Sequence, residues 1–255
     1  MGANLNLDLS DRESLILDKL AREGSLAVSQ LARELGVSEV TARSDLKNLE
    51  DKGFISRTRG GAYPAFHKDI LERQRLNLEE KNRIARAAAE LVRDGDRIMI
   101  EAGTTTALIV RCLAGRRGVQ VVTNSTLVFS YARLNPALTI ILTGGLFRKE
   151  TESLVGPVAL RAIADFNVRL AFVGTDGFSV ERGMTTQLVE GAEIVKAMRR
   201  QAEETWLVAD SSKYGRTGFV RVLGLSEVDG MITDSRLGQE AIDSLADTGL
   251  RPRIV

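Results

Sequence analysis

The chain has 255 residues, of which 44% are hydrophobic, and its 35 basic and 34 acidic residues give a formal net charge of +1. This length can bury one large core, or a large core beside a small one, while the balanced charge excludes a global attraction to nucleic acid or to anionic membranes. The single cysteine and the single histidine argue against an internal disulfide, a metal or iron–sulfur cofactor and serine–histidine catalysis. No apolar run approaches the ~20 residues of a membrane span, so we expect a soluble, cytoplasmic protein without a membrane partner.

Three helical segments are predicted near the start of the chain. Apolar residues at helical spacing indicate a first helix over residues 11–24 and a second within "LAVSQLARELG". Ser38 is a favourable N-cap for a third helix, in which we expect Val40, Leu46 and Leu49 to face a core. Two helices joined by a few residues around a glycine are typical of a helix-turn-helix.

A short β-hairpin is predicted after the third helix, in the stretch "FISRTRGGAYP". Phe54 begins a strand, Gly60 and Gly61 supply a turn, and Tyr63 begins the return strand. The order of these elements favours a winged helix-turn-helix over the alternative, an ordinary small helical domain that ends in a hairpin. We therefore expect a DNA-binding domain over residues 1–64.

The third helix is expected to lie in the major groove of DNA. Arg43 can donate two hydrogen bonds to guanine and Asn48 can read adenine, unless Arg43 instead pairs with Glu39 or Asp45 on its own helix. Hydroxyl side chains on this helix can reach phosphates, and arginines on the wing would meet the DNA backbone or the minor groove. The candidate DNA contacts are Ser38, Thr41, Arg43, Lys47, Asn48, Arg57 and Arg59, and Glu39 and Ala42 are expected on the same outer face.

The charge of this region indicates how many copies must bind. Residues 38–64 contain five basic side chains (Arg43, Lys47, Lys52, Arg57, Arg59) and four acidic ones (Glu39, Asp45, Glu50, Asp51). Contacts with phosphates supply most of the affinity for DNA, so a single copy would bind weakly. We therefore expect a homo-oligomer, a dimer or a tetramer, on a repeated DNA site.

A second, larger domain is predicted over residues 79–255, after a polar and partly helical linker over residues 65–78. Short, apolar, β-branched runs such as "VQVVT", "LTIIL", "RLAFVGT" and "TWLVAD" alternate with helical stretches such as "KNRIARAAAELV". This alternation is typical of a mostly parallel sheet with helices on both faces, so the whole chain is assigned to the α/β class.

Polar, glycine-containing turns follow several of the predicted strands. In "EAGTTT", Gly103 allows close approach of the backbone, and the amides at the start of the following helix favour an anion, although a simple capped turn would also fit this motif. Glu101 would repel a phosphate unless it faces sugar hydroxyls, so a phosphorylated polyol explains both features. Because parallel strands end at one edge of a sheet, we expect the strand ends to converge on one crevice. Asn124, Gly144, Arg148, Asp176 and Lys213 lie at or near the ends of further predicted strands.

The segment "VSEVTARSDLKNLEDKGFISRTRGGAYP" resembles the N-terminal signature of the DeoR family of bacterial transcription regulators. The segments "EAGTTT", "VTNS", "TGGLFR", "GTDGFS", "EIVKAM" and "LVADSSKYG" resemble, in order, its C-terminal sensor domain. The resemblance implies a repressor of a sugar-catabolic operon that a phosphorylated sugar releases from operator DNA, and a sensor fold similar to ribose-5-phosphate isomerase. It also implies that the effector-binding residues are Glu101, Gly103, Thr104, Thr105, Thr106, Asn124, Gly144, Arg148, Asp176 and Lys213. We expect no cofactor.

Three positions depart from the family pattern. Ser44 stands where a second arginine is usual, Arg59 replaces a histidine on the wing, and Gly191 replaces an acidic residue beside the "EIVKAM" helix. Ser44 removes one expected contact with phosphate or base. Glu190 or Glu193 can compensate for Gly191.

A sugar-phosphate isomerase is the alternative function. Asp176 could serve as a base and Lys213 as its electrostatic partner. However, "FSVERGMTTQLVEGAE" lacks the glycine-rich stretch with a lysine that the isomerases carry after the corresponding strand, and a winged helix has no use in a metabolic isomerase. We therefore expect a regulator and not an enzyme.

Overall fold

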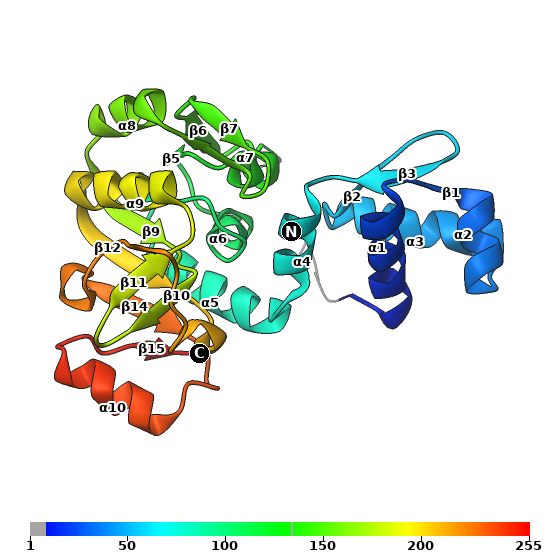
Figure 1. Ribbon diagram of the computed structural model, residues 1–255. Helices are drawn as coiled ribbons and strands as arrows, with labels where there is room; N and C mark the ends of the chain where they lie inside the picture. The colour runs from blue at the N-terminus through cyan, green and yellow to red at the C-terminus, as the bar shows by residue number, and fades with distance from the viewer. Residues whose placement is uncertain (1–8, 134) are drawn as a thin grey trace. The chain divides into compact units, whose positions relative to one another are not determined.

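The computed structural model describes residues 9–133 and 135–255 and divides the chain into two compact units, which meet in sequence between Leu78 and Glu79 (Figure 1). The first eight residues of the predicted domain 1–64 lie outside the described residues. Within the described residues, no helix is long and apolar enough to cross a membrane.

The N-terminal unit is a winged helix-turn-helix, as the sequence predicts. Its three short strands form an antiparallel sheet in the order β1-β3-β2, and apolar side chains from all three of its first helices enclose one core. The elements of this unit are α1 (Asp11–Glu23), β1 (Leu26–Ala27), α2 (Val28–Leu35), α3 (Glu39–Asp51), β2 (Ile55–Arg57), β3 (Gly61–Pro64) and α4 (Lys68–Arg75).

Close packing of the backbone explains a glycine at the base of the wing. A Cβ atom on Gly61 would lie 2.1 Å from the carbonyl oxygen of Leu26, where β1 pairs with β3. The turn between β2 and β3 is closed by a hydrogen bond from the N–H of Thr58 to the carbonyl of Gly61 at 2.8 Å. Any side chain at position 61 would therefore separate the wing from the helical core.

Two ion pairs join α1 to the α3 region. The guanidinium of Arg12 donates to both carboxylate oxygens of the buried Asp45, at 2.6 and 2.8 Å, and Lys52 donates to the buried Glu13 at 2.8 Å. The Arg12 and Lys52 side chains stay partly exposed, so the pairs satisfy two carboxylates that the core would otherwise leave without partners. These contacts hold α1 against α3.

The segment 65–78, predicted as a linker, contains the helix α4. Ile70 and Leu71 on this helix are buried, and Leu71 belongs to the core of the N-terminal unit. Arg75 also forms an ion pair with Asp18 on α1. The N-terminal unit therefore extends to Leu78 in the structure.

The C-terminal unit is built on the predicted parallel sheet. Seven strands pair in parallel in the order β15-β14-β12-β9-β4-β5-β6, and two small antiparallel sheets are added to them. The strands are β4 (Arg97–Ile100), β5 (Val119–Thr123), β6 (Leu138–Leu142), β7 (Leu146–Arg148), β8 (Ser153–Val155), β9 (Val168–Val173), β10 (Gly177–Ser179), β11 (Gly183–Thr186), β12 (Ala202–Val208), β13 (Val220–Arg221), β14 (Gly230–Thr233) and β15 (Arg253–Ile254). The helices are α5 (Leu78–Glu90), α6 (Thr106–Cys112), α7 (Thr126–Ala132), α8 (Pro157–Ala164), α9 (Val189–Gln201) and α10 (Gln239–Asp247), with short 3-10 turns η1 (Ser211–Lys213) and η2 (Leu225–Glu227).

Helices cover both faces of the seven-stranded sheet (Figure 1). Ala159 on α8 and Met198 on α9 pack against Met99 on β4 and Ala171 on β9, which face the same side of the sheet. Side chains alternate along a strand, so Ile98 and the other alternate residues of β4 and β9 serve the opposite face. Both faces are apolar, as is usual for a parallel sheet.

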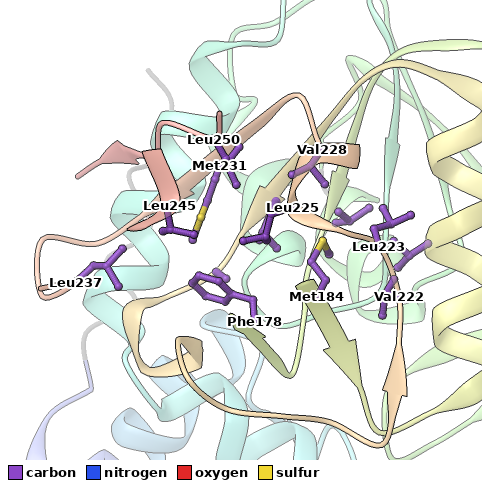
Figure 2. Close-up of a cluster of buried hydrophobic side chains, with 14 of the residues drawn as sticks. Phe178, Met184, Val222, Leu223, Leu225, Val228, Met231, Leu237, Leu245 and Leu250 are labelled. Atoms are coloured by element: carbon purple, nitrogen blue, oxygen red, sulfur yellow. The ribbon is translucent and has the colours of Figure 1, made fainter. Parts of the chain in front are cut away.

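A second apolar cluster supports the loops at one end of the sheet. Figure 2 shows Phe178 of β10 and Met184 of β11 beside Leu225 and Met231, so the small antiparallel sheet is anchored to the main one. The ring of Phe178 also meets the edge of Tyr214, with ring centres 5.5 Å apart. The segment that carries η1 therefore rests on a rigid base.

Candidate nucleic-acid interface and effector site

The helix α3 presents most of the predicted DNA contacts to solvent. Ser38 caps its first turn, since the Ser38 hydroxyl accepts the N–H of Thr41 at 3.1 Å and lies 2.9 Å from the Thr41 hydroxyl. Thr41 is half-buried, whereas Arg43, Lys47 and Asn48 are exposed. The cap leaves the first turn of α3 regular and open to solvent.

The four cations of the predicted interface divide into two pairs. Arg43 forms a salt bridge with Glu39 at 2.8 Å, which is the alternative considered for it from the sequence, and Arg57 on the wing pairs with Glu50 at 2.6 Å. The hydrogen bond from Arg57 lowers the pKa of Glu50 below its usual value, against the smaller opposing effect of burial. Within the described part of the chain, Lys47 and Arg59 make no hydrogen bond or ion pair, so these two cations are available to phosphates.

Two positions on α3 differ from the sequence prediction. Val40 was expected in the core but is 75% exposed, and Ala42 was expected on the outer face but is fully buried. The buried stripe of the helix runs through Ala42, Leu46 and Leu49, which leaves Val40 on the opposite side. Val40 is therefore a candidate DNA contact that the sequence pattern did not reveal.

The carboxyl ends of the parallel strands bring the second group of predicted residues to one edge of the sheet. From β4 the chain proceeds through β5 to β6 on one side, and from β9 through β12 and β14 to β15 on the other. The connections after β4 and β9 therefore run in opposite directions, and such a switch point is where ligands bind in open α/β sheets. The "EAGTTT" loop follows β4 and lies at this switch point.

The "EAGTTT" loop leaves several main-chain donors without partners. Thr106 is fully buried and its hydroxyl donates to the carbonyl of Gly103 at 3.0 Å, which closes the loop onto the start of α6. The N–H groups of Thr104, Thr105 and Thr106 meet no acceptor within the described part of the chain. Donors of this kind at the first turn of a helix favour an anion.

Glu101 and Asn124 hold this loop from either side. The Glu101 carboxylate accepts the N–H of Gly174, after β9, at 3.1 Å. Asn124, after β5, is buried; its side-chain oxygen accepts the N–H of Ala102 at 3.0 Å and its amide donates to the carbonyl of Leu154 at 3.2 Å. Both side chains therefore fix the shape of the loop, and the Glu101 carboxylate lies at the switch point.

A second group of predicted residues gathers around the start of α9. Asp176 accepts hydrogen bonds from the Thr186 hydroxyl at 2.8 Å and from the N–H of Gln187 at 2.9 Å. Arg148 pairs with Glu190 at 2.6 Å, and its buried Nε meets no acceptor within the described residues. Glu190, one of the two acidic residues considered beside Gly191, is therefore held against Arg148.

Gly144, also predicted at this edge, lies between β6 and β7 with a left-handed φ of 71°. The next residue, Gly145, has a φ of 122°, and a Cβ atom there would lie 2.6 Å from the carbonyl oxygen of Val155. The two glycines therefore let the β7–β8 hairpin turn back over the sheet edge, and this places Arg148 beside α9.

Lys213 lies on η1, which is held by the carboxylate of Asp234, a residue that was not predicted from the sequence. Asp234 is fully buried at the end of β14 and accepts the N–H and hydroxyl of Ser211 at 2.7 and 3.0 Å, and the Nε of Arg236 at 3.2 Å. Burial opposes ionisation of Asp234, but the donors from Ser211 and Arg236 outweigh it and lower its pKa. The Lys213 ammonium has no ion-pair partner in the described part of the chain.

The hydrogen bonds bring the predicted residues together as two groups. The first comprises the "EAGTTT" loop, Asn124 and the end of β9. The second comprises Asp176, Arg148 and the start of α9, and one main-chain hydrogen bond, from the N–H of Gly215 to the carbonyl of Phe178, ties the Lys213 segment to it. Among the described residues, no cluster of three histidine, cysteine or acidic side chains could hold a metal ion.

Two family models match the two units of the chain. A model of the DeoR-like helix-turn-helix domain matches residues 12–65, and a model of the DeoR C-terminal sensor domain matches residues 76–235. Together they cover both the winged unit and most of the parallel sheet.

Relatives match along nearly the whole chain. The HTH-type transcriptional repressor GlcR of Bacillus subtilis is 36% identical over 93% of this chain and 92% of that protein. The lactose phosphotransferase system repressor of Lactococcus lactis subsp. lactis is 32% identical over 91% and 93%, respectively. Among solved structures, ribose 5-phosphate isomerase A from Methanocaldococcus jannaschii aligns with 54% of this chain and 55% of that chain, at 21% identity and a TM-score of 0.41.

Proposed function

Because the chain belongs to the DeoR family of DNA-binding transcriptional regulators, we propose that it represses genes of sugar catabolism and leaves its operator when a phosphorylated sugar binds. The lactose phosphotransferase system repressor, a relative along most of the chain, supports sugar metabolism as the regulated process. A regulator of this kind works in the cytoplasm, where bacterial DNA lies.

The observation that carries the sensor role is the set of unpaired N–H groups at Thr104, Thr105 and Thr106 beside the charged Glu101. The N–H groups favour a phosphate, and the carboxylate favours hydroxyl groups. A phosphorylated sugar carries both at a separation of a few ångströms. Arg148 and Lys213 supply further positive charge at the same edge of the sheet.

A chain of contacts offers a route from the effector site to the DNA-binding unit. Ser211, two residues before Lys213, binds Asp234, which binds Arg236. The Arg236 guanidinium lies 3.5 Å from Glu80 in the first turn of α5, directly after the N-terminal unit in sequence. Movement of η1 toward a bound sugar phosphate would therefore act on the start of α5. Repression is relieved if this state binds DNA less well.

We assign the contact between copies to the strand β6. Among the described residues, β6 is the outermost strand on its side of the sheet, and its sequence "LTIIL" has no charged residue. Ile140 and Ile141 are half-buried and Leu142 is exposed, whereas free edge strands are usually protected by charge or proline. A second copy related by a two-fold axis could pair with this edge and present two winged units to a repeated site.

The isomerase alternative has less support from the geometry. Both donors that contact Asp176, the Thr186 hydroxyl and the N–H of Gln187, bind its Oδ2 and hold that carboxylate as a structural support for the loop. These contacts engage one oxygen of Asp176 and favour a structural role for this side chain. Turnover of a pentose phosphate that is abolished in Asp176→Ala would favour the enzyme over the regulator.

The test of the proposed function is a thermal-shift screen of the full chain with sugar phosphates, each paired with its parent sugar. A ligand that binds the folded state raises the melting temperature by mass action. We expect one sugar phosphate to raise it and its parent sugar to have no effect, and the same compound to release the chain from DNA. Equal shifts with the parent sugars would refute the phosphate site, and a sugar phosphate that binds equally well with and without DNA would refute the coupling.

A further inference from the structure

Val40 lies on the exposed face of α3 and is 75% exposed. Val40, Ser44 and Lys47 follow at spacings of four and three residues and therefore share one side of the helix, opposite the buried stripe that contains Leu46. Val40 lies in the first turn, and residues at the start of a recognition helix are the ones that reach base edges. An isopropyl group is thus presented where sequence is read.

The neighbours of Val40 leave it accessible to DNA. Ser44, one turn further along the same face, is small, and the Arg43 guanidinium is drawn toward Glu39 on the edge of the face. The Ser38 hydroxyl caps the helix and so does not extend over Val40. A close approach of the helix to the floor of the groove is therefore sterically possible at this point.

The chemistry of Val40 selects one group on DNA. The major-groove edges of base pairs present hydrogen-bond donors and acceptors and a single apolar group, the C5-methyl of thymine. A protein partner fits less well, because Glu39, Arg43 and Lys47 surround Val40 with charge and no apolar patch extends from it. We propose that Val40 reads a thymine in each half-site of the operator by contact with its C5-methyl group, a role that rests on the DNA binding of the family.

The test removes the methyl group from the DNA and its partner from the protein. The probe is a duplex selected by the full chain from a random DNA library, in which each thymine is replaced in turn by deoxyuridine, which lacks only the methyl group. We expect one thymine in each half-site at which this change weakens binding about four-fold, the factor for one methyl-sized group returned to water. In Val40→Ala, binding should be weaker by a similar factor, and deoxyuridine at that thymine should have no further effect.

A matched variant separates this contact from general affinity. Lys47→Ala, which removes a neighbouring cation, should weaken binding and keep the four-fold effect of deoxyuridine, because a phosphate contact does not sense the methyl group. The proposal is overturned if no thymine shows the effect, or if Val40→Ala retains the full effect at the same thymine. Equal binding to all duplexes would refute sequence reading by α3 altogether, and thus this role for Val40.

Discussion

The carboxylate of Glu101 accepts the main-chain N–H of Gly174 at 3.1 Å and thereby joins the ends of β4 and β9, the two strands from which the sheet order proceeds in opposite directions. This contact holds a negative charge beside a helix start whose free N–H groups favour an anion. A site that only had to bind phosphate would be weakened by such a charge. The pairing of the two features is the reason for expecting a ligand with both phosphate and hydroxyl groups.

The variant Glu101→Gln tests this pairing, because glutamine keeps an oxygen that can accept the Gly174 N–H. We expect the melting temperature to stay close to that of the wild type. Affinity for the sugar phosphate should fall about ten-fold or more, since a hydrogen bond to a charged group is lost. Affinity for inorganic phosphate should rise, since the repulsion is removed. Calorimetric titration of both ligands would measure this, and a parallel loss for the two would contradict the role of Glu101.

Gly103 tests the loop itself. A Cβ atom at this position would lie 2.9 Å from the Thr106 hydroxyl, which donates to the Gly103 carbonyl. Gly103→Ala should therefore displace Thr106, lower stability by about 1 kcal/mol and weaken binding of phosphate and sugar phosphate at least ten-fold, with DNA binding unchanged. Gly238→Ala is the control, because its Cβ would meet no atom within 4 Å. Unchanged ligand binding in Gly103→Ala would show that the anion lies elsewhere.

The fold could be predicted well from the sequence because the spacing of apolar residues within each element agrees with the order of the elements along the chain. Alternating apolar runs and glycine-rich strand ends are direct consequences of a doubly covered parallel sheet. The exceptions on α3 are instructive: in "SEVTARSDL", Val40 and Ala42 are both apolar, and a short window does not fix the phase of the buried stripe. Asp45 is also buried on that stripe, where it pairs with Arg12. Because Asp45 is polar, the spacing of apolar residues could not predict that it is buried.

The sequence could indicate which residues gather at the effector site, but not how their side chains are used. Asn124 and Asp176 were predicted as ligand contacts, and the structure shows their polar atoms bound to the protein's own loops. Asp234 lies at the end of a predicted strand, yet its role depends on Ser211 and Arg236, which approach it only in the folded chain. Such contacts join segments that are distant in sequence, so they follow from packing and not from a motif.

The exposed pair between Arg43 and Glu39 leads to a prediction for DNA binding. An exposed pair of this kind contributes only about 0.3–0.5 kcal/mol to stability, so its loss should leave the fold intact. Glu39→Gln should bind DNA several-fold more tightly, because it removes a negative charge from the interface and frees Arg43. Arg43→Ala should bind more weakly, with a shallower dependence of affinity on salt. Affinities at several salt concentrations would show this, and weaker binding by Glu39→Gln would contradict it.

Arg236 provides a test of the route from the effector site to α5. In Arg236→Gln, the link to Glu80 is lost, while Asp234 keeps its donors from Ser211. We expect nearly normal affinity for the sugar phosphate alone and for DNA alone. The reduction of DNA affinity by saturating sugar phosphate should become much smaller than in the wild type, where a coupling of about 5- to 150-fold is typical.

The control for this variant is Arg253→Gln. Arg253 pairs with Glu90 at the other end of α5, at 2.5 Å. The variant therefore removes a similar ion pair on the same helix, but at the end that does not contact the Asp234 network. Its coupling between sugar phosphate and DNA should equal that of the wild type. Equal coupling in Arg236→Gln as well would show that the signal does not pass through Glu80.

If two copies pair through β6, a charged residue on this strand should separate them. Thr139 is an exposed residue on β6, so Thr139→Lys should fold normally and place a charge where the second copy would pair. Sedimentation should then change from a dimer to a monomer, and DNA affinity should fall at least ten-fold because the two winged units no longer bind as one. Ile254→Lys places the same charge on β15, at the opposite edge of the sheet, and should leave the assembly intact. Dissociation by Ile254→Lys instead of Thr139→Lys would move the interface to β15, and an unchanged assembly in both variants would exclude pairing at either edge.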